Sequence, residues 1–302
     1  MESKPGIIDL HIHSCFSDGS LSPEQILERA AEEGLSAISI TDHDTIAGAR
    51  EALRHGIPRE LDFVTGVEIS AAFPSTFGNA GSLHILGYGI ATDHKGLNKA
   101  LDKQCFARSN RNPLIIEKLN AIGIPASIEA VSTVTGKKDI ARPHIADYMV
   151  KSGYAKDIDD AFDRFLGKGK PAYVDKFRIP AEKAISLILE AGGIAVLAHP
   201  VLLLENKSDT FPDTFLENLV DTLASCGLGG IEAYYPGQTA ALTTYFEDIA
   251  ARKGLLTTGG TDFHGEITPG VKMGSGYDGN LSIPHDIFRK LWKALNRNNG
   301  RE

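Results

Sequence analysis

The sequence predicts an α/β protein: a seven-stranded β/α barrel that carries a helical insertion. Short apolar or β-branched runs alternate with helical patterns along much of the 302-residue chain, as is typical of parallel strands joined by crossover helices. Side chains able to bind metal stand where several of these runs give way to loops, as at one end of such barrels. We therefore expect a barrel domain formed by 1–94 and 170–302, and an insertion at 95–169.

Seven runs qualify as strands of the predicted barrel. They are Ile7–His11, Ala37–Thr41, Asp62–Val67, Leu83–Tyr88, Ile194–Ala198, Gly230–Tyr234 and Leu255–Thr258. The first helix has clear boundary signals, because Ser22 can cap it, Pro23 suits its first position and Gln25 completes a capping box. Gly34 is a suitable residue to end that helix.

The predicted insertion differs in pattern from the rest of the chain, because 95–169 indicates successive helices without a convincing strand. Gly123-Ile124-Pro125 and the glycines of 167–169 separate these helices. After the insertion, 180–192 restores the helix-then-strand order, and 284–296 predicts a closing helix. We expect the insertion to act as a cap over any substrate that binds at the barrel.

Composition and charge exclude several classes of protein. The chain has 31 lysines and arginines against 39 acidic residues, a net charge of -8, which disfavours binding of long duplex nucleic acid by a basic surface. Three widely spaced cysteines form no CxxC pair, so neither a disulfide framework nor a thiolate zinc site is indicated. Neither a signal peptide nor a membrane span is recognisable, and we expect a cytoplasmic protein.

The first strand ends in a His-x-His pattern. Alternation along a strand points His11 and His13 to the same side, where two imidazoles can hold one cation. Asp18 follows on a turn, and His43 and Glu68 end the next two predicted strands. A bridging carboxylate such as Glu68 would offset the repulsion between cations about 3.5–4 Å apart.

Further candidates lie at later strands. His84 and His199 stand among aliphatic residues, where metal ligation competes with the simpler interpretation of a buried imidazole bonded to a carbonyl. Asp262 and His264 alternate in a glycine-rich loop after the seventh strand. Six of the ten histidines fall in such clusters, which argues against coincidence. The candidate metal ligands are His11, His13, Asp18, His43, Glu68, His84, His199, Asp262 and His264.

Some nearby residues have two interpretations. Asp42 and Asp44 flank His43 and could orient it, although Asp44 could equally cap a helix. Tyr234 and Tyr235 could stack on a base, but core packing explains them as well. Three histidines in polar surroundings need no function: His55, His94 and His285.

These motifs, in this order, resemble the polymerase and histidinol phosphatase (PHP) family over nearly the whole chain. The resemblance implies a distorted seven-stranded β/α barrel, similar to a TIM barrel, around a phosphoesterase site with three divalent metals. All nine candidate ligands match the family's ligand positions. The resemblance further implies that Glu68 is a carboxylate that bridges metals. His84 and His199 would complete the ligand set of one metal, and Asp18, His43 and His264 would bind another.

Within that family the chain most resembles a bacterial branch with a helical insertion, which removes phosphate from nucleoside 3',5'-bisphosphates or trims RNA from its 5' end. The insertion matches this branch at 108–112, 141–145 and 169–173. A guanidinium forks onto phosphate oxygens, so Arg142 is the first candidate for substrate binding, with His144 beside it. Arg108 and Arg111 are weaker candidates, because their spacing on a predicted helix favours an exposed salt-bridged face.

The sequence thus predicts a metal-dependent phosphoesterase whose bound cations activate water and neutralise charge on a phosphate monoester. The substrate would be a small phosphorylated molecule, a nucleoside 3',5'-bisphosphate or a short RNA 5' end. The ligand types suit manganese, iron or zinc, and the resemblance favours manganese. Candidates to protonate the leaving alkoxide are His264, His199 and His144.

Three alternatives stay open. The substrate could be another small phosphomonoester such as histidinol phosphate. An amidohydrolase that cleaves C–N bonds also begins with His-x-His, but it predicts a bridging lysine where this chain has Glu68, and it needs no counterpart of Asp18, His43 and His264. A non-catalytic nucleotide-binding module is the third alternative, and the complete ligand set argues against it.

Overall fold

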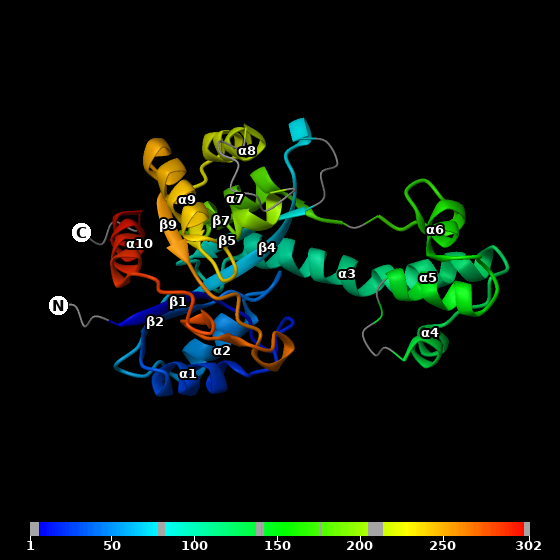
Figure 1. The fold of residues 1–302 in the computed structure, drawn as a ribbon, viewed down its shortest axis with the longest axis horizontal. Coiled ribbons are helices and arrows are strands. Elements are labelled where there is room, and N and C mark those ends of the chain that lie inside the picture. Colours follow the sequence, from blue (N-terminus) through cyan, green and yellow to red (C-terminus); the bar gives the residue numbers. More distant parts are fainter. Residues whose placement is uncertain are drawn as a thin grey trace. The chain divides into compact units, whose positions relative to one another are not determined.

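Two compact units make up the chain in the computed structural model, which describes residues 6–77, 82–136, 140, 142–175, 177–204 and 214–298 (Figure 1). The first unit contains 1–102 and 178–302, and the second contains 103–177. Helix α3 (Lys95–Ala121) begins in the first unit and continues into the second. The insertion expected at 95–169 overlaps the second unit, and its role as a substrate cap stays a prediction.

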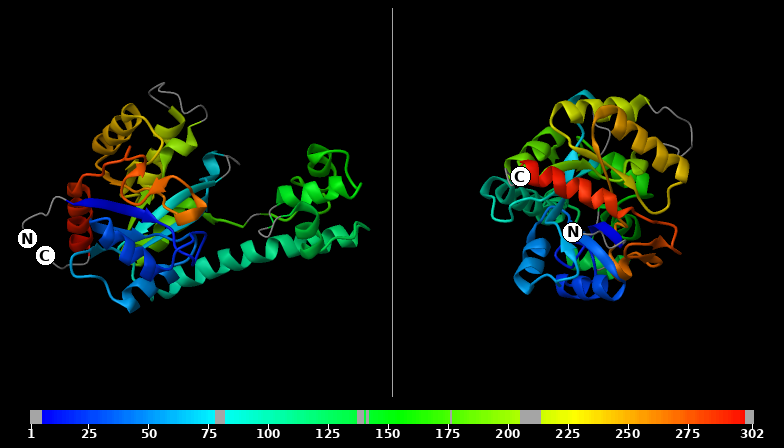
Figure 2. Two further views of the ribbon diagram at one scale, coloured as in Figure 1. Left: turned by 60° about the horizontal axis from the view of Figure 1, so that its bottom comes forward. Right: turned by 90° about the vertical axis from the view of Figure 1, so that its left-hand side faces the viewer.

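The strands of the first unit form two main sheets, with helices around them (Figure 2). The three-stranded sheet is parallel and has the order β1 (Ile7–Ile12), β2 (Leu35–Ile40), β3 (Asp62–Phe63). The six-stranded sheet has the order β6 (Ile179–Pro180), β4 (Gly66–Ala72), β5 (Ser82–Tyr88), β7 (Ile194–Leu197), β8 (Gly230–Tyr234), β9 (Leu256–Gly259). A short antiparallel pair follows, β10 (Val271–Lys272) and β11 (Gly276–Tyr277).

Two isolated parallel bridges join the edges of these sheets. Ile12 pairs with Phe263, where the His13 amide also donates to the Phe263 carbonyl at 2.9 Å, and His43 pairs with Glu68. The strands β1, β2, β4, β5, β7, β8 and β9 therefore follow one another around a closed path. The predicted α/β class is confirmed, and the path contains seven strands.

The expectation of parallel strands throughout is wrong for β5. This strand runs antiparallel to both neighbours, with Leu86 opposite Glu68 and Ile85 opposite Leu197. Only 73–81 connects β4 to β5, and a parallel crossover needs a dozen or more residues. Because β5 is reversed, its beginning lies at the end of the sheet where its neighbours finish, which brings His84 to the same end as the other candidate ligands.

The predicted strand Asp62–Val67 is also wrong, because it is two strands in different sheets. β3 ends at Phe63 and β4 begins at Gly66, so Glu68 lies inside β4 and not at a strand end. The chain changes sheets in a tight space at Gly66, where an added Cβ would lie 2.4 Å from Ser39 Oγ. Only glycine fits such a close crossing.

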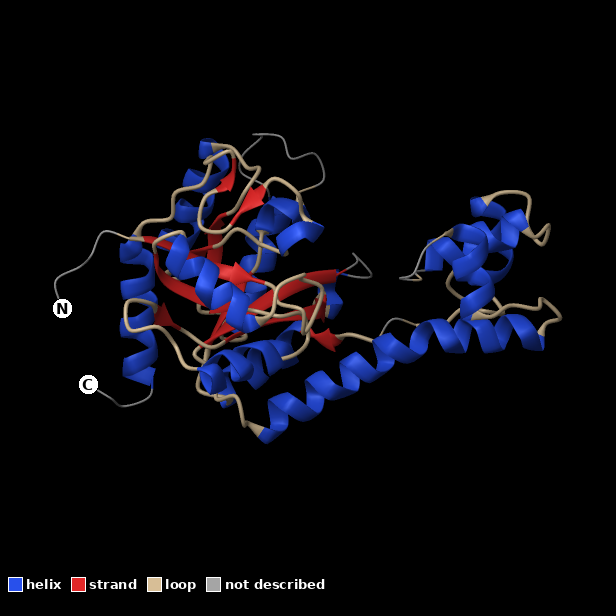
Figure 3. Ribbon diagram, turned by 90° about the horizontal axis from the view of Figure 1, so that it is seen from below, coloured by secondary structure: helices blue, strands red, loops and turns tan. Residues whose placement is uncertain are grey.

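Helices cover the strands of the first unit (Figure 3). They are α1 (Pro23–Glu32), α2 (Ala47–His55), α7 (Ala181–Glu190), α8 (Thr214–Ser225), α9 (Ala240–Lys253) and α10 (His285–Asn298), with 3₁₀ turns at η1 (Ser75–Phe77), η3 (Pro200–Leu203) and η4 (Gly265–Ile267). The capping box predicted for α1 is confirmed, since the Gln25 amide donates to Ser22 Oγ and the Ser22 amide donates to Gln25 Oε1.

The seven strands of the closed path form a ring, and apolar side chains fill one end of this strand ring. Strand residues and α10 contribute to this cluster, which includes Ile8, Leu10, Leu86, Tyr88, Val196 and Leu291. The Tyr88 hydroxyl is buried there and donates to the Leu10 carbonyl at 3.0 Å. The polar residues described below are therefore confined to the other end of the ring.

The second unit is helical in its described residues and has its own apolar core. After α3 it contains α4 (Ile128–Thr135), α5 (Arg142–Lys151), α6 (Ile158–Ala161) and the π-helical turn η2 (Phe162–Leu166). Core members include Ile115, Leu119, Val131, Ile145, Met149 and Leu166. Among the helices described in either unit, none combines the length and the apolar character needed to cross a bilayer.

Candidate metal centre

All nine predicted ligands lie in the first unit, and their polar atoms converge at one end of the strand ring. Three overlapping groups have one atom per residue within 4.8 Å of every other: His13, Asp18, His43 and His264; His11, His13, Glu68 and Asp262; His43, Glu68 and His84. His199 contacts the same glutamate, since its Nε2 lies 2.9 Å from Glu68 Oε1. Residues from distant strands therefore form one cluster.

In the group of His11, His13, Glu68 and Asp262, the five distances that involve the histidines match those of a tetrahedral site. The Nε2 atoms of His11 and His13 are 3.1 Å apart. From His11 Nε2, Glu68 Oε2 and Asp262 Oδ1 lie at 3.3 and 3.4 Å, and from His13 Nε2 they lie at 3.2 and 3.1 Å. Four ligands about 2.0–2.1 Å from a central ion stand about 3.3–3.4 Å from one another. The group therefore fits a divalent ion.

Glu68 lies at the junction of the groups and is fully buried. Its Oε1 lies 2.8 Å from His84 Nδ1, and its Oε2 lies 3.0 Å from His43 Nδ1. Despite these short distances, Oε2 and His43 Nδ1 form no hydrogen bond with any described residue. A buried polar atom left in this state costs about 1–3 kcal/mol. Bound cations would satisfy both atoms, so the donor set fits metal.

Asp18 marks the open side of the cluster, because 54% of its side chain is exposed. His264 Nε2 lies 3.3 Å from Asp18 Oδ1, and His43 Nε2 lies 3.7 Å from Asp18 Oδ2. His13 presents Nε2 to the buried group and Nδ1 to Asp18, at 3.6 Å. The cluster thus runs from a buried end to a solvent-accessible end, as a site that admits a substrate must.

Glu232, on β8, supports the cluster and was missed by the sequence analysis. Its Oε1 lies 2.9 Å from His11 Nδ1, and its Oε2 accepts a hydrogen bond of 2.6 Å from the His199 amide. The carboxylate oxygen accepts a hydrogen bond from His11 Nδ1, which leaves Nε2 as the atom that could bind a cation beside Glu68. The available signal was a glutamate in the middle of an otherwise apolar strand.

Glu232→Gln is expected to lower metal affinity or activity about 10- to 100-fold, the usual effect of losing a group that orients a ligand histidine. The amide keeps the shape but loses the charge that holds the His11 tautomer. Titration with manganese, with the bound metal measured by atomic emission, would give the metal affinity, and phosphate release would give the activity. Glu247→Gln is the matched control, since Glu247 accepts from Tyr234 instead. Equal affinity in both variants would refute the role of Glu232.

Asp9, also missed, ties the two halves of the cluster together. This buried carboxylate accepts hydrogen bonds from the Thr261 amide at 2.9 Å, the Thr261 hydroxyl at 2.5 Å and the Gly274 amide at 2.8 Å. Burial raises the pKa of Asp9 to about 6, and the hydrogen bonds from Thr261 and Gly274 oppose that rise. Asp9 therefore joins β1, which carries His11, to the loop before Asp262.

The two aspartates beside His43 bind the neighbouring backbone. Asp42 accepts from the Ser14 amide and the Ser17 hydroxyl, both at 2.7 Å, and so holds the turn before Asp18. Asp44 accepts from the Ser70 amide at 2.8 Å. Helix α2 begins at position 47 and does not use Asp44 as its cap, so that alternative is wrong.

The backbone is strained at the cluster. Four non-glycine residues among those described have positive φ, and three of them belong to this region: Asp44 (56°), His199 (26°) and Asp262 (53°). Such conformations persist where the surrounding contacts over-determine them, and they concentrate at functional sites. Gly260 allows the loop to pass against β1, because a Cβ there would lie 2.2 Å from that of His11.

Opposite charges balance one another in the cluster. Burial raises the pKa of Glu68, but the positive charges on His43 and His11 outweigh it, so this pKa lies well below its ordinary value. Burial lowers the pKa of His11, and the carboxylates of Glu232 and Glu68 more than reverse that effect. A proton is therefore favoured on His11 when no cation is bound, and metal binding at His11 should release it.

In the second unit, Arg142 lies at the start of α5 in an aromatic environment. Its guanidinium carbon lies 5.3 Å from the Phe162 ring centroid and 5.9 Å from that of Tyr173, and Nη1 donates to the Leu166 carbonyl at 3.4 Å. His144 follows on the same helix and is partly buried. Aromatic faces hold a guanidinium in place without neutralising it, which leaves its charge available for an anion.

Arg111 lies close to Arg142. Its Nε donates to the Val174 carbonyl at 3.4 Å, and its pKa is lowered by burial and by the positive charge of Arg142. The expected exposed salt-bridged face is therefore wrong for Arg111, which is partly buried, whereas Arg108 is exposed. Two guanidinium groups with mutually repelling charges form a favourable place for an anion.

A family model of the PHP domain matches residues 9–296. The chain belongs to the PHP family. It is 32% identical over 289 residues to 3',5'-nucleoside bisphosphate phosphatase of Chromobacterium violaceum, which covers 95% of this chain and 96% of that protein. It is 33% identical over 290 residues to the 5'-3' exoribonuclease Rnm of Escherichia coli, with 95% and 89% covered.

A third PHP relative has a different named activity. Phosphoribosyl 1,2-cyclic phosphate 1,2-diphosphodiesterase of Eggerthella lenta is 34% identical over 264 residues, with 86% of this chain and 95% of that protein covered. Family membership and the converged donor groups identify the chain as a metal-dependent phosphoesterase. The family and the enzyme class predicted from the sequence are confirmed.

Proposed function

We propose that this PHP phosphoesterase removes the 3'-phosphate of nucleoside 3',5'-bisphosphates and also acts on the 5' ends of short RNA. The observation that carries the proposal is the shared position of Glu68 among the donor groups, which suits several adjacent cations, as phosphate ester hydrolysis requires. The named activities of the phosphatase and exoribonuclease relatives support the substrate class.

The proposed centre contains three divalent ions, with manganese preferred. Mixed imidazole and carboxylate donors suit manganese, iron or zinc better than magnesium, which prefers oxygen alone. Such ions would lower the pKa of water towards neutrality and neutralise charge on the phosphoryl oxygens. All nine predicted residues are proposed as their ligands, because each has a polar atom in the cluster described above.

Three histidines are predicted to protonate the leaving alkoxide, and the contacts of two of them, His264 and His199, can be compared with that role. His264 Nδ1 donates to the Asp262 carbonyl at 2.7 Å, so its Nε2 lone pair faces Asp18 and suits a ligand. His199 presents Nε2 to Glu68. These contacts suit His264 and His199 to metal binding, and all three predicted proton donors, His264, His199 and His144, remain proposals for this role.

Arg142 and Arg111 are proposed to bind the second phosphate of the substrate, with Arg108 as a further contact. Arg142→Lys is expected to raise KM for a nucleoside 3',5'-bisphosphate about tenfold or more with little change in kcat, because lysine keeps the charge but loses the bidentate fork. Steady-state phosphate release measures both constants.

The matched control for Arg142→Lys is Arg164→Lys, since Arg164 lies in the same unit but pairs with Asp160 on the surface. A nucleoside 3'-monophosphate, which lacks the second phosphate, should show a smaller KM change in Arg142→Lys. An equal change in KM for both substrates would show that Arg142 does not bind the second phosphate.

A panel of phosphate-release assays with manganese tests the proposed substrate. We expect the highest kcat/KM for adenosine 3',5'-bisphosphate, with lower values for sugar phosphates, histidinol phosphate and a 1,2-cyclic phosphate. Short 5'-phosphorylated RNA should be shortened from its 5' end. A preference for the cyclic diester, or for histidinol phosphate, would replace the proposed substrate, and release of an amine would support an amidohydrolase instead.

We also propose a cytoplasmic location and a small phosphorylated substrate, with no binding of long duplex nucleic acid or of a membrane. The three cysteines, Cys15, Cys105 and Cys226, form no disulfide in the part of the chain that the structure describes, which fits a reducing compartment. The acidic net charge of -8 supports a small ligand over long duplex nucleic acid.

A further inference from the structure

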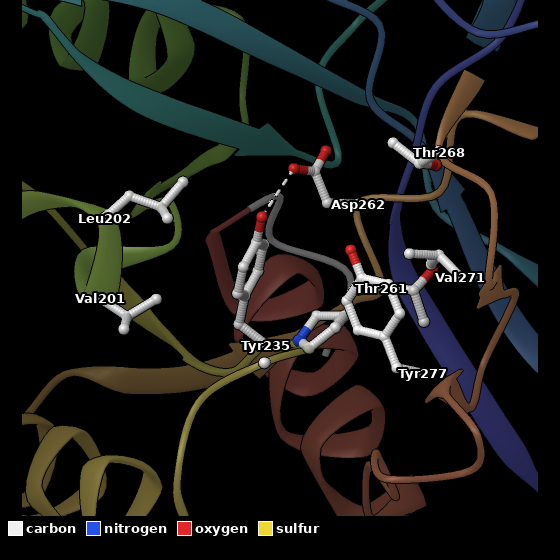
Figure 4. A pocket seen from close by; sticks show the side chains of 10 residues that line it. Val201, Leu202, Tyr235, Thr261, Asp262, Thr268, Val271 and Tyr277 are labelled. Atoms are coloured by element: carbon white, nitrogen blue, oxygen red, sulfur yellow. Dashed lines mark hydrogen bonds between the residues drawn. The ribbon is translucent and has the colours of Figure 1, made fainter. Parts of the chain in front are cut away.

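A small pocket in the first unit opens beside the cluster of candidate metal ligands, and Asp262 lies in its wall (Figure 4). Its volume is about 210 Å³, and its lining comprises Val201, Leu202, Tyr235, Pro236, Gly237, Thr261, Asp262, Thr268, Val271 and Tyr277. Asp262 belongs both to this lining and to the tetrahedral donor group. A molecule held at the metal cluster can therefore extend directly into the pocket.

The pocket walls suit a flat, uncharged group. Two tyrosines and several aliphatic side chains line it, and Leu202 and Tyr277 remain 47% and 44% exposed. Asp262 is the one charged residue among the described residues of the lining, and no lysine or arginine occurs there. A second phosphate would meet a carboxylate without a cation, so the pocket favours a neutral part of the substrate.

Tyr235 is held rigidly at the boundary between pocket and cluster. Its hydroxyl donates to Asp262 Oδ2 at 3.1 Å, and its ring packs edge-on against His199 with centroids 5.6 Å apart. In contrast, the Tyr234 hydroxyl donates to Glu247 on α9. The two tyrosines therefore differ in role: Tyr234 serves packing and Tyr235 lines the pocket.

We propose that this pocket holds the nucleobase of the substrate, an inference that rests on the function proposed above. Sites for whole drug-sized ligands measure about 300–1,000 Å³, so a smaller pocket suits one ring system of a molecule anchored elsewhere. Bases stack on aromatic side chains whatever their sequence, because every base has a π-face. The four bases are therefore expected to be accepted similarly.

The test compares a substrate that has a base with one that lacks it. For wild-type enzyme, kcat/KM for adenosine 3',5'-bisphosphate should exceed that for ribose 3,5-bisphosphate. Tyr277→Ala should reduce this ratio about 5- to 100-fold, the usual range for losing one aromatic stacking partner. Tyr277→Phe retains the ring and should restore the ratio, which a merely structural effect of the hydroxyl would not do.

Leu202→Ala provides a second variant in case Tyr277→Ala fails to fold, and it should also lower the ratio. Its matched control is Leu53→Ala on α2, which removes a leucine of similar exposure, 46%, away from the pocket lining. Ratios that stay at the wild-type value in Tyr277→Ala and Leu202→Ala would overturn the inference, and so would a wild-type ratio near one.

Binding measured without turnover separates this inference from the proposed function. Saturation-transfer NMR on protein loaded with diamagnetic zinc, with a non-hydrolysable phosphonate analogue of adenosine 3',5'-bisphosphate, should show stronger transfer to the base protons than to the ribose protons, and Tyr277→Ala should weaken it. A wild-type enzyme that hydrolyses neither bisphosphate contradicts the proposed function. Uniform transfer, or transfer that Tyr277→Ala leaves unchanged, contradicts the base pocket.

Discussion

Glu68→Gln is expected to lower kcat/KM by at least about 1,000-fold, with metal content falling at the same time. Its two oxygens reach five imidazoles: His84 and His199 on Oε1, and His11, His13 and His43 on Oε2. Losing the shared charge removes several kcal/mol of stabilisation, and each loss of about 1.4 kcal/mol slows the reaction tenfold. Phosphate-release kinetics and atomic emission measure the two effects.

Glutamine matches the shape of glutamate, so Glu68→Gln changes charge and not packing. Glu51→Gln is the matched control, because Glu51 pairs with Arg54 in an exposed ion pair on α2 and should have almost no effect. A Glu68→Gln enzyme with wild-type turnover and metal content would show that the cluster does not depend on a shared carboxylate.

Removal of metal is expected to reduce activity to below about 1% of the loaded enzyme and to lower the melting temperature by about 5–10 °C. Ions at 100 times their dissociation constant stabilise the fold by about 2.7 kcal/mol, and each kcal/mol shifts melting by about 2–4 °C in a domain of this size. Chelation followed by calorimetry tests both effects, and added manganese should reverse them.

The Glu68→Gln protein is the control for the thermal effect, because its melting temperature should respond much less to added manganese. Acidification should weaken the thermal response of the wild type, since protons and metal compete for the same imidazoles. Full activity in protein shown by atomic emission to be free of metal would refute the mechanism.

Four of the candidate ligands could be recognised from the sequence because each is a polar side chain in a place that normally favours an apolar one. His11 and His13 lie on an apolar strand, and His84 and His199 interrupt aliphatic runs. Burying such groups costs free energy unless they have partners. The pattern therefore indicated function before any contact was known.

Asp9 and Glu232 satisfy the same criterion, yet the sequence did not indicate their roles. Glu232 contacts His11, which is 221 residues away in the chain, so no local pattern relates them. Their partners include backbone amides, those of His199 and Thr261, and every residue offers an amide whatever its side chain. Residues that act through the backbone leave little specific signal in sequence.

Strand direction also lay beyond the sequence. Periodicity shows that a segment is extended, but it contains no direction, so the reversal of β5 depended on the short connection and on pairing with β4 and β7. The division of Asp62–Val67 between two sheets was equally invisible, because the apolar run continues across the change at Gly66.

The α/β class, the PHP family and the residue types that can bind metal could all be predicted before folding was considered, since they depend on local periodicity and on motifs. The tertiary structure decided how the donor atoms are grouped, which residues orient them, and which of Tyr234 and Tyr235 lines a pocket. The physical reason is that ligand geometry and cavity shape arise from contacts between segments far apart in the chain, and those distances exist only after folding.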